Sequence, residues 1–406
     1  MRLIATRRVN DEMTLGEDVH CENADGTPLL RAGTKLSAAY TKSLLEHGIN
    51  AVYVEDAVSA GIVVPRALST ELKSSASKTV AKAMSSLREL KPKDAGLGDQ
   101  EIAELTAIAA LIAEHVAGSA EVGMALIDLS TTDDQVYEHS VNVTALGLLI
   151  GDRLLRTHGF RDWEGKRSFE GIQARIVRLG LGLLLHDIGK MAIPKDLADK
   201  KEPLTAEETA FVRRHPVMGC DMLRGDTVTP LVKAVVRSHH ERWDGAGYPD
   251  GKRGEDINQL ARIASVANFY DAIVSARPGS PMQPPEVGWR AVIDARETRF
   301  DPLVVDTFRE LVAPWPIGTE VLLSDGRRGI VASVPKGQLD RPTVRVVHTE
   351  GAQERAGVEI PLLEQPDLQI TGTALDPPLA GVSDQPGSAA ATTPLRPAQG
   401  ETARAA

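Results

Sequence analysis

Apolar residues recur three and four positions apart through much of the chain, which is the spacing of one buried helix face. The run EIAELTAIAALIAEHVAG, at 101–118, keeps this spacing throughout. We expect helices from about 66 to 128, with a break at KPKDAGLGD, and a mostly helical stretch from 131 to about 311. The pattern predicts a mainly α protein built on a helical bundle.

Both ends of the chain show a different pattern. The first part reads as a mixed α/β module, with a helix between Ser37 and Gly48 and a strand at INAVYVED. Near the other end, EVLLSDGRRGIVASV predicts two short strands around an Asp-Gly turn, and RPTVRVVHTEG predicts a third. We therefore expect a mixed module at 1–62, a helical connector at 63–130, a central domain at 131–312 and a small β module at 313–372.

Composition argues against several classes of protein. The last 34 residues, 373–406, hold five prolines and no aromatic residue, so we expect them to be disordered. A net charge of −10 argues against a protein that coats nucleic acid polymers or anionic membranes. The longest apolar run, near 176–185, is too short to span a membrane, and MRLIATRRVNDEM lacks a secretory signal's apolar core. Two cysteines are too few for a disulfide framework. We expect a cytoplasmic protein.

Histidines gather in the middle of the chain. His186 and Asp187 follow the apolar run in LLLHDIGK, and His139 stands at the head of another apolar helix. The adjacent pair His239 and His240 precedes the glycine-rich stretch ERWDGAGYP.

One further histidine, His215, follows a helix that Thr205 and Glu208 begin with a capping box. We expect His215 at the end of that helix, because Pro216 disfavours helical geometry in the residue before it.

Imidazole and carboxylate groups on apolar helices are costly to bury unless they are paired or bind a metal. This ligand set, without thiolates, suits iron, manganese or zinc, and Asp187 is able to bridge two ions. Water between two such ions loses a proton near neutral pH and attacks phosphorus in line. A lone histidine is more often a satisfied or exposed residue, and that reading applies to His20, His47, His115, His158 and His348.

Five motifs occur in the order found in the HD-GYP family: EHSVNV, LLLHDIGKMAIP, RRHPVMG, HHERWDGAGYPDG and ARIASVANFYDAIVSARP. The stretch from 131 to about 311 therefore resembles these bacterial metal-dependent phosphodiesterases of the HD superfamily. The resemblance implies an HD-type helical bundle that hydrolyses cyclic di-GMP in second-messenger signalling, either to linear pGpG alone or further to GMP. It also implies two divalent metal ions, iron or manganese, and signalling proteins or a second copy of the chain as partners.

The resemblance assigns roles residue by residue. Asp187 would bridge the metals, and Lys190 would approach the attacking water or the phosphate; these two are the expected catalytic residues. Trp243 would pack under the glycine-rich loop or stack on a guanine. The expected metal ligands are His139, His186, Asp187, His215, His239, His240 and Asn268. The expected substrate-binding residues are Lys200, Gly247, Tyr248, Pro249 and Arg277.

Three positions depart from the family pattern. Asn268 stands where the family has an aspartate ligand, and Asp271, three residues later on the same helix face, is a candidate to replace it. Gln135 stands where three-metal members carry a glutamate, so we expect no third metal. Ser280 replaces a basic side chain after Arg277. We expect a two-metal centre with one weakened ligand and reduced activity.

Two other functions fit the same residues. If Asn268 and Ser280 have ended turnover, the domain would sense a ligand or bind a protein; it would then hold few metal ions and tolerate His186→Ala. Sites of the HD superfamily also serve other phosphate esters, so another nucleotide is a candidate substrate. The Gly-Tyr-Pro loop and Arg277 favour cyclic di-GMP.

Overall fold

Helices dominate the protein, as the apolar spacing predicts. The structure, a computed structural model, describes residues 1–19, 28–47, 49, 51–88, 96–119, 135–198, 200, 202–223, 228–275, 283–350 and 353–374. Gly48, Arg277, Ser280 and residues 375–406 of the tail that we expect to be disordered lie outside these residues. The expected start of the tail at 373 is wrong, because Thr373 is the last residue of a strand. No helix in the described ranges is both long enough and apolar enough to cross a membrane.

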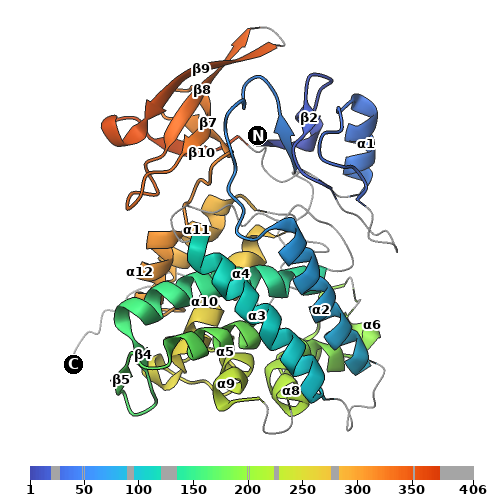
Figure 1. Cartoon of the computed structure of the whole chain (residues 1–406), viewed down its shortest axis with the longest axis vertical. Helices are drawn as coiled ribbons and strands as arrows, with labels where there is room; N and C mark the ends of the chain where they lie inside the picture. The colour runs from blue at the N-terminus through green and yellow to red at the C-terminus, as the bar shows by residue number, and fades with distance from the viewer. Residues whose placement is uncertain are drawn as a thin grey trace, which may run out of the picture.

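A helical body forms the larger part of the molecule (Figure 1). Its elements are α2 (Thr70–Arg88), α3 (Asp99–Ser119), α4 (Gln135–His158), β4 (Phe160–Arg161), β5 (Arg167–Ser168), α5 (Ile172–Leu184), η2 (Ile188–Ala192), α6 (Lys195–Ala198), α7 (Ala206–Val212), α8 (His215–Met222), α9 (Pro230–Ser238), η3 (Gly254–Asp256), α10 (Gln259–Val274), α11 (Pro285–Asp294) and α12 (Pro302–Leu311).

Helix α4 lies at the centre of this body and contacts both α5 and α10, while α3 and α9 pack against α5. Two glycines of α4 allow α5 to approach closely. A Cβ atom at Gly147 would lie 2.5 Å from the Leu183 side chain, and one at Gly151 would lie 2.4 Å from the Leu179 side chain. The leucines of α5 therefore fill the space beside these glycines, and one continuous apolar core joins the helices.

The N-terminal elements form a small antiparallel sheet with one helix. They are β1 (Arg2–Ala5), η1 (Thr6–Arg8), β2 (Thr14–Leu15), α1 (Ala38–Glu46) and β3 (Ala51–Glu55), in the sheet order β1-β3-β2. Ser37 is the N-cap residue of α1, and β3 falls within INAVYVED, so both expectations are confirmed.

The C-terminal elements form an antiparallel five-stranded sheet. They are β6 (Glu320–Leu323), β7 (Arg328–Ser333), β8 (Thr343–Glu350), β9 (Gln353–Pro361), η4 (Leu362–Glu364) and β10 (Ile370–Thr373), in the sheet order β10-β6-β7-β8-β9. The three expected strands are present, and Gly326 takes the positive φ of 86° that the turn between β6 and β7 requires.

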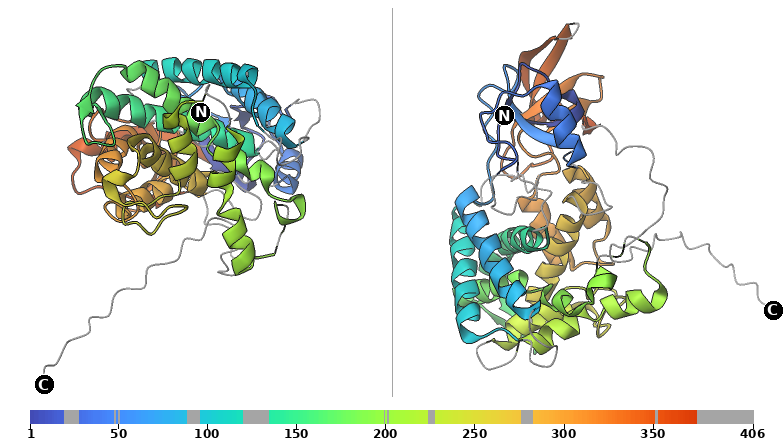
Figure 2. Two further views of the ribbon diagram at one scale, coloured as in Figure 1. Left: turned by 90° about the horizontal axis from the view of Figure 1, so that it is seen from below. Right: turned by 90° about the vertical axis from the view of Figure 1, so that its right-hand side faces the viewer.

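The two small modules lie side by side above the helical body in both side views (Figures 1 and 2). Leu3 of β1 forms an isolated parallel bridge with Thr319, and its N–H donates to the Gly318 carbonyl oxygen over 3.0 Å. The chain therefore returns to its own beginning after it has built the helical body.

Candidate metal centre

Asp187 lies where the apolar helix α5 has ended. The helix stops at Leu184, and His186 and Asp187 come directly before η2. Gly189 of η2 lies against the start of α8: a Cβ atom there would be 1.9 Å from the His215 carbonyl oxygen. Only glycine fits this contact, and the contact brings His215 to Asp187.

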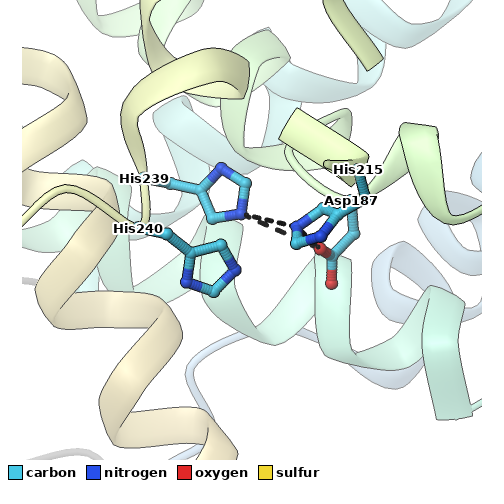
Figure 3. Close-up of side chains that lie close together, drawn as sticks. All are labelled: Asp187, His215, His239 and His240. Carbon is cyan, nitrogen blue, oxygen red and sulfur yellow. Dashed lines mark hydrogen bonds and ion pairs between the residues drawn. The ribbon is translucent and has the colours of Figure 1, made fainter. Parts of the chain in front are cut away.

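Four imidazoles present Nε2 to the carboxylate of Asp187, two to each oxygen. His215 Nε2 lies 3.2 Å and His239 Nε2 3.8 Å from Oδ1 (Figure 3). His186 Nε2 lies 3.3 Å and His139 Nε2 3.7 Å from Oδ2. The buried carboxylate thus connects two groups of histidines.

Hydrogen bonds on the far side of the rings hold three of these histidines in place. Nδ1 lies 2.7 Å from a backbone carbonyl oxygen in His186, and 2.9 Å from one in both His215 and His239. In each case the carbonyl belongs to the residue three positions earlier. Because Nδ1–H donates there, Nε2 carries the lone pair that faces Asp187.

The fourth histidine, His139 of α4, is held by a carboxylate instead. Its Nδ1 lies 2.5 Å from Asp271 Oδ2, and its Nε2 lies 3.0 Å from Asn268 Oδ1. Asp271 also accepts a hydrogen bond of 2.8 Å from the Ser275 hydroxyl. Asn268 therefore lies on the inner side of the ring, facing the cluster, and Asp271 lies on the outer side.

The cluster fits a cation on its own geometry. Asp187 Oδ1 and His186 Nε2 are buried without a hydrogen-bond partner among the described residues, which is costly unless a ligand pairs with them. One ligand atom from each residue lies within 4.8 Å of the others in two groups that share Asp187. These groups are Asp187, His215, His239 and His240, and His139, His186 and Asp187.

Electrostatics favour the protonation states that metal binding needs. Burial alone would raise the pKa of Asp187, but Lys190, whose Nζ lies 2.6 Å from Oδ2, and His186 hold it well below its usual value. Burial lowers the pKa of His239 and of His240 well below the usual value, and neighbouring histidines lower both further. The carboxylate is therefore charged and these imidazoles are neutral at pH 7.

The glycine-rich loop folds back over the end of α9. Gly247 packs on the chain: a Cβ atom there would lie 2.4 Å from the Arg242 backbone nitrogen. Tyr248 stacks on His240, with ring centroids 4.6 Å apart and planes 21° apart, and a cis peptide bond joins it to Pro249. The loop thus covers the His240 side of the cluster.

Glu241 anchors this loop and was not predicted as a functional residue. Its carboxylate is buried and accepts hydrogen bonds from the backbone N–H of Asp250, over 2.7 Å, and of Lys252, over 3.1 Å. Its position directly after the two histidines, in the sequence HHE, is the signal that could have identified it. Asp271 was expected as a substitute metal ligand, whereas its carboxylate lies beside Nδ1 of His139 and supports that ring.

Other expected residues contact partners outside the cluster or lie outside the described ranges. Lys200 forms an ion pair with Glu208, at 2.7 Å from each carboxylate oxygen. The Arg262 guanidinium lies over the Trp243 ring, with its Cζ 5.5 Å from the ring centroid. The Gln135 side chain and Arg277 are not among the described residues.

The expected position of His215 is wrong. Helix α7 begins with the predicted capping box, but it ends at Val212, and His215 is the first residue of α8. Pro216 falls in the first turn of α8, where the missing N–H is one that a helix leaves unpaired. Proline therefore starts a helix here.

Comparison with known proteins places this site in a class. Residues 174–304 match the family described as HD domain. A cyclic di-GMP phosphodiesterase of Pseudomonas aeruginosa is 38% identical over 229 residues, which cover 55% of this chain and 50% of the relative. A cyclic di-GMP phosphodiesterase response regulator of Xanthomonas campestris is 38% identical over 136 residues, covering 33% and 35%. The resemblance to the HD-GYP family is thereby confirmed.

Two further proteins are similar to this chain. A protein named 3'3'-cGAMP-specific phosphodiesterase 2, of Vibrio cholerae, is 31% identical over 128 residues, covering 31% of this chain and 24% of its own length. The solved structure of an HDG"Y"P protein from Bdellovibrio bacteriovorus covers 75% of this chain and 97% of its own, at 17% identity and a TM-score of 0.43. The matched region spans half or less of the length of the curated relatives reported above.

Proposed function

We propose that this chain is a metal-dependent phosphodiesterase that hydrolyses cyclic di-GMP, either to linear pGpG alone or further to GMP. The observation that carries the proposal is the buried Asp187 carboxylate, with two imidazole Nε2 atoms facing each oxygen. Several relatives are named cyclic di-GMP phosphodiesterases, which supports the substrate and the reaction class.

Two divalent ions, iron or manganese, are the proposed cofactors, and Asp187 is the ligand that they share. His215, His239 and His240 would complete one group, and His139, His186 and Asn268 the other. When bound, such ions polarise the phosphate and lower the pKa of water.

Lys190 is the proposed catalytic residue from the chain itself. Its ammonium pairs with Asp187, and its side chain is 35% exposed, so it is open to a ligand on one side. From there it can donate to a phosphate oxygen and stabilise the negative charge that grows in the transition state.

The remaining contacts to the substrate are assigned to Gly247, Tyr248 and Pro249 of the loop, and to Lys200 and Arg277. Tyr248 supports this role, because its ring already stacks on the ligand His240. Lys200 would have to leave its ion pair with Glu208 to reach a phosphate. The cytoplasmic location and a signalling partner or second copy stay predictions.

A second candidate substrate is 3'3'-cGAMP, since two of the relatives are named as phosphodiesterases specific for it. The experiment is chromatography of cyclic di-GMP and of 3'3'-cGAMP after incubation with anaerobically purified protein that is loaded with ferrous iron or manganese. We expect pGpG, alone or with GMP, abolished by Asp187→Ala and retained by Asp306→Asn, which changes an exposed acid paired with Arg296. Cleavage of 3'3'-cGAMP alone would transfer the proposal to that substrate, and two intact substrates would overturn it.

A further inference from the structure

Arg299 lies directly beneath the glycine-rich loop, although no motif draws attention to it. The Arg299 carbonyl oxygen accepts from the Trp243 N–H over 3.0 Å, and the preceding carbonyl, of Thr298, accepts from the Asp244 N–H over 2.8 Å. These two hydrogen bonds fix the backbone of this segment against the start of the loop.

The guanidinium of Arg299 rests on an aromatic surface next to the cluster. Its Cζ lies 4.4 Å from the centroid of Phe269 and 5.7 Å from that of Phe300. Phe269 follows Asn268 in α10, and Asn268 contacts the ligand His139. The guanidinium therefore rests on a side chain of α10 whose neighbour in the sequence contacts the cluster.

No carboxylate among the described residues forms an ion pair with Arg299, and Asp244 only raises its pKa from a distance. Arg299 has no hydrogen bond or ion pair from its guanidinium within the described part of the chain, although the side chain is half-buried. The neighbouring acid Asp244 is engaged by Arg242, at 2.5 and 3.0 Å. Burial, and then the charge of Arg242, lower the pKa of Arg299 to about 10, so it remains protonated at pH 7.

A second arginine, Arg213, has no ion pair within the described ranges and lies near Tyr248 of the loop. The Arg213 guanidinium is exposed and lies 5.4 Å from the centroid of the Tyr248 ring. Both arginines interact electrostatically with the Tyr248 phenol. Two positive charges near one tyrosine that stacks on His240 form a place for an anion beside the candidate metal centre.

We propose that Arg299 binds the second phosphodiester of a cyclic dinucleotide, the one that is not being cleaved. The inference rests on the proposed function, because a cyclic dinucleotide carries two phosphodiesters and the metal centre acts on one at a time. Arginine suits this role, since its planar fork donates two parallel hydrogen bonds to a phosphate. Phe269 would hold that fork in place and reduce the entropy lost on binding.

The test compares two substrates. Bis(p-nitrophenyl) phosphate offers one phosphodiester, whereas cyclic di-GMP offers two. We expect Arg299→Gln to lower the ratio of kcat/KM for cyclic di-GMP to kcat/KM for bis(p-nitrophenyl) phosphate by about tenfold or more, mainly through KM. Arg296→Gln, which removes a nearby arginine that pairs with Asp306, should leave the ratio unchanged.

Further variants separate binding from folding. Arg299→Lys keeps the charge on the aromatic surface but loses the fork, so it should lower the ratio by a smaller factor at an unchanged melting temperature. An unchanged ratio in folded Arg299→Gln, or an equal loss on both substrates, would overturn the inference. A loss with cyclic di-GMP but not with cyclic di-AMP would show a contact to guanine and overturn the phosphate assignment. Wild-type protein that cleaves only bis(p-nitrophenyl) phosphate would instead overturn the proposed function, and this inference with it.

Discussion

At the scale of the residue, position around the His139 ring separates two similar side chains. Asn268 and Asp271 lie three residues apart on α10, yet one faces Nε2 and the other faces Nδ1. In the proposed metal centre, the first would bind the cation directly, and the second would orient the imidazole and raise its basicity.

Asn268→Asp should strengthen metal binding, because a charged oxygen replaces a neutral one on the inner side of the ring. Without metal, the new carboxylate would lie near Asp187 and Asp271, so the chelated variant should melt below chelated wild type. With metal the order should reverse. The measurement is the melting temperature of both proteins with and without manganese. Equal metal-induced shifts would remove Asn268 from the ligand set.

Asp271→Asn should weaken metal binding by about tenfold, in the range known for changes to residues that support a ligand. The amide oxygen can still accept from Nδ1–H, but the negative charge that makes His139 a stronger ligand is lost. Titration with a competing chelator gives the affinity. Asp294→Asn, at the exposed end of α11, serves as the control. An unchanged affinity would mean that Asp271 only packs.

At the scale of the element, the loop of residues 241–252 depends on close backbone contact. A Cβ atom at Gly247 would meet the Arg242 nitrogen at 2.4 Å and the His240 carbonyl oxygen at 2.6 Å, and neither atom can move alone. The loop is held from the other side by the Glu241 carboxylate.

Gly247→Ala should therefore shift the loop and lower kcat/KM for cyclic di-GMP by at least about tenfold. Gly372→Ala in β10, where an added Cβ meets nothing within 4 Å, is the matched control. Steady-state kinetics on both variants check the expectation. Wild-type kinetics in Gly247→Ala would show that the loop takes no part in substrate binding.

Most elements could be predicted because local signals mark them. The Ser37 cap and the Thr205–Glu208 capping box start helices where the sequence places them. Strands β9 and β10 could not be predicted in the same way. Both are edge strands of the sheet, and the residues of β9 are largely exposed, so the apolar alternation of a half-buried strand is lost.

The residues of the candidate site also fall into two groups, those that a local sequence signal marks and those that it does not. Motifs bring in the histidines and Asp187, and spacing draws attention to Asp271. The contacts of Glu241, the support that Asp271 gives to His139 and the surroundings of Arg299 form only in the folded chain. The start of α8 at His215 was missed because a proline is found both just after the end of a helix and in the first turn of a helix. The sequence around Pro216 does not distinguish the two cases.

At the scale of the whole molecule, a buried ion network joins the two ends of the chain. Arg2 is fully buried and reaches Asp56 at 2.6 Å, Glu354 at 2.7 Å and Glu320 at 3.4 Å. Arg8 and Arg328 also contact Glu320 and Glu354. The small modules at either end are therefore tied to each other as well as to the helical body.

Arg2→Met should lower the free energy of unfolding by about 3 kcal/mol, since it leaves buried carboxylates short of a partner. The loss is at the low end of the usual range because Arg8 and Arg328 still reach Glu320. Urea unfolding measures it. Arg327→Gln, whose pair with Asp325 is exposed, should change stability by less than about 0.5 kcal/mol. If Arg2→Met lowers the free energy of unfolding by no more than Arg327→Gln does, the network adds no stability.

The metal content of the purified chain tests the central claim most directly. After loading with manganese or ferrous iron and gel filtration, mass spectrometry of the metal should find about two ions per chain in wild type. Asp187→Asn, which keeps the shape of the side chain but removes the charge that both groups of histidines share, should lose most of this metal. Wild-type protein that folds normally and retains no metal, or a variant that retains as much as wild type, would contradict the account.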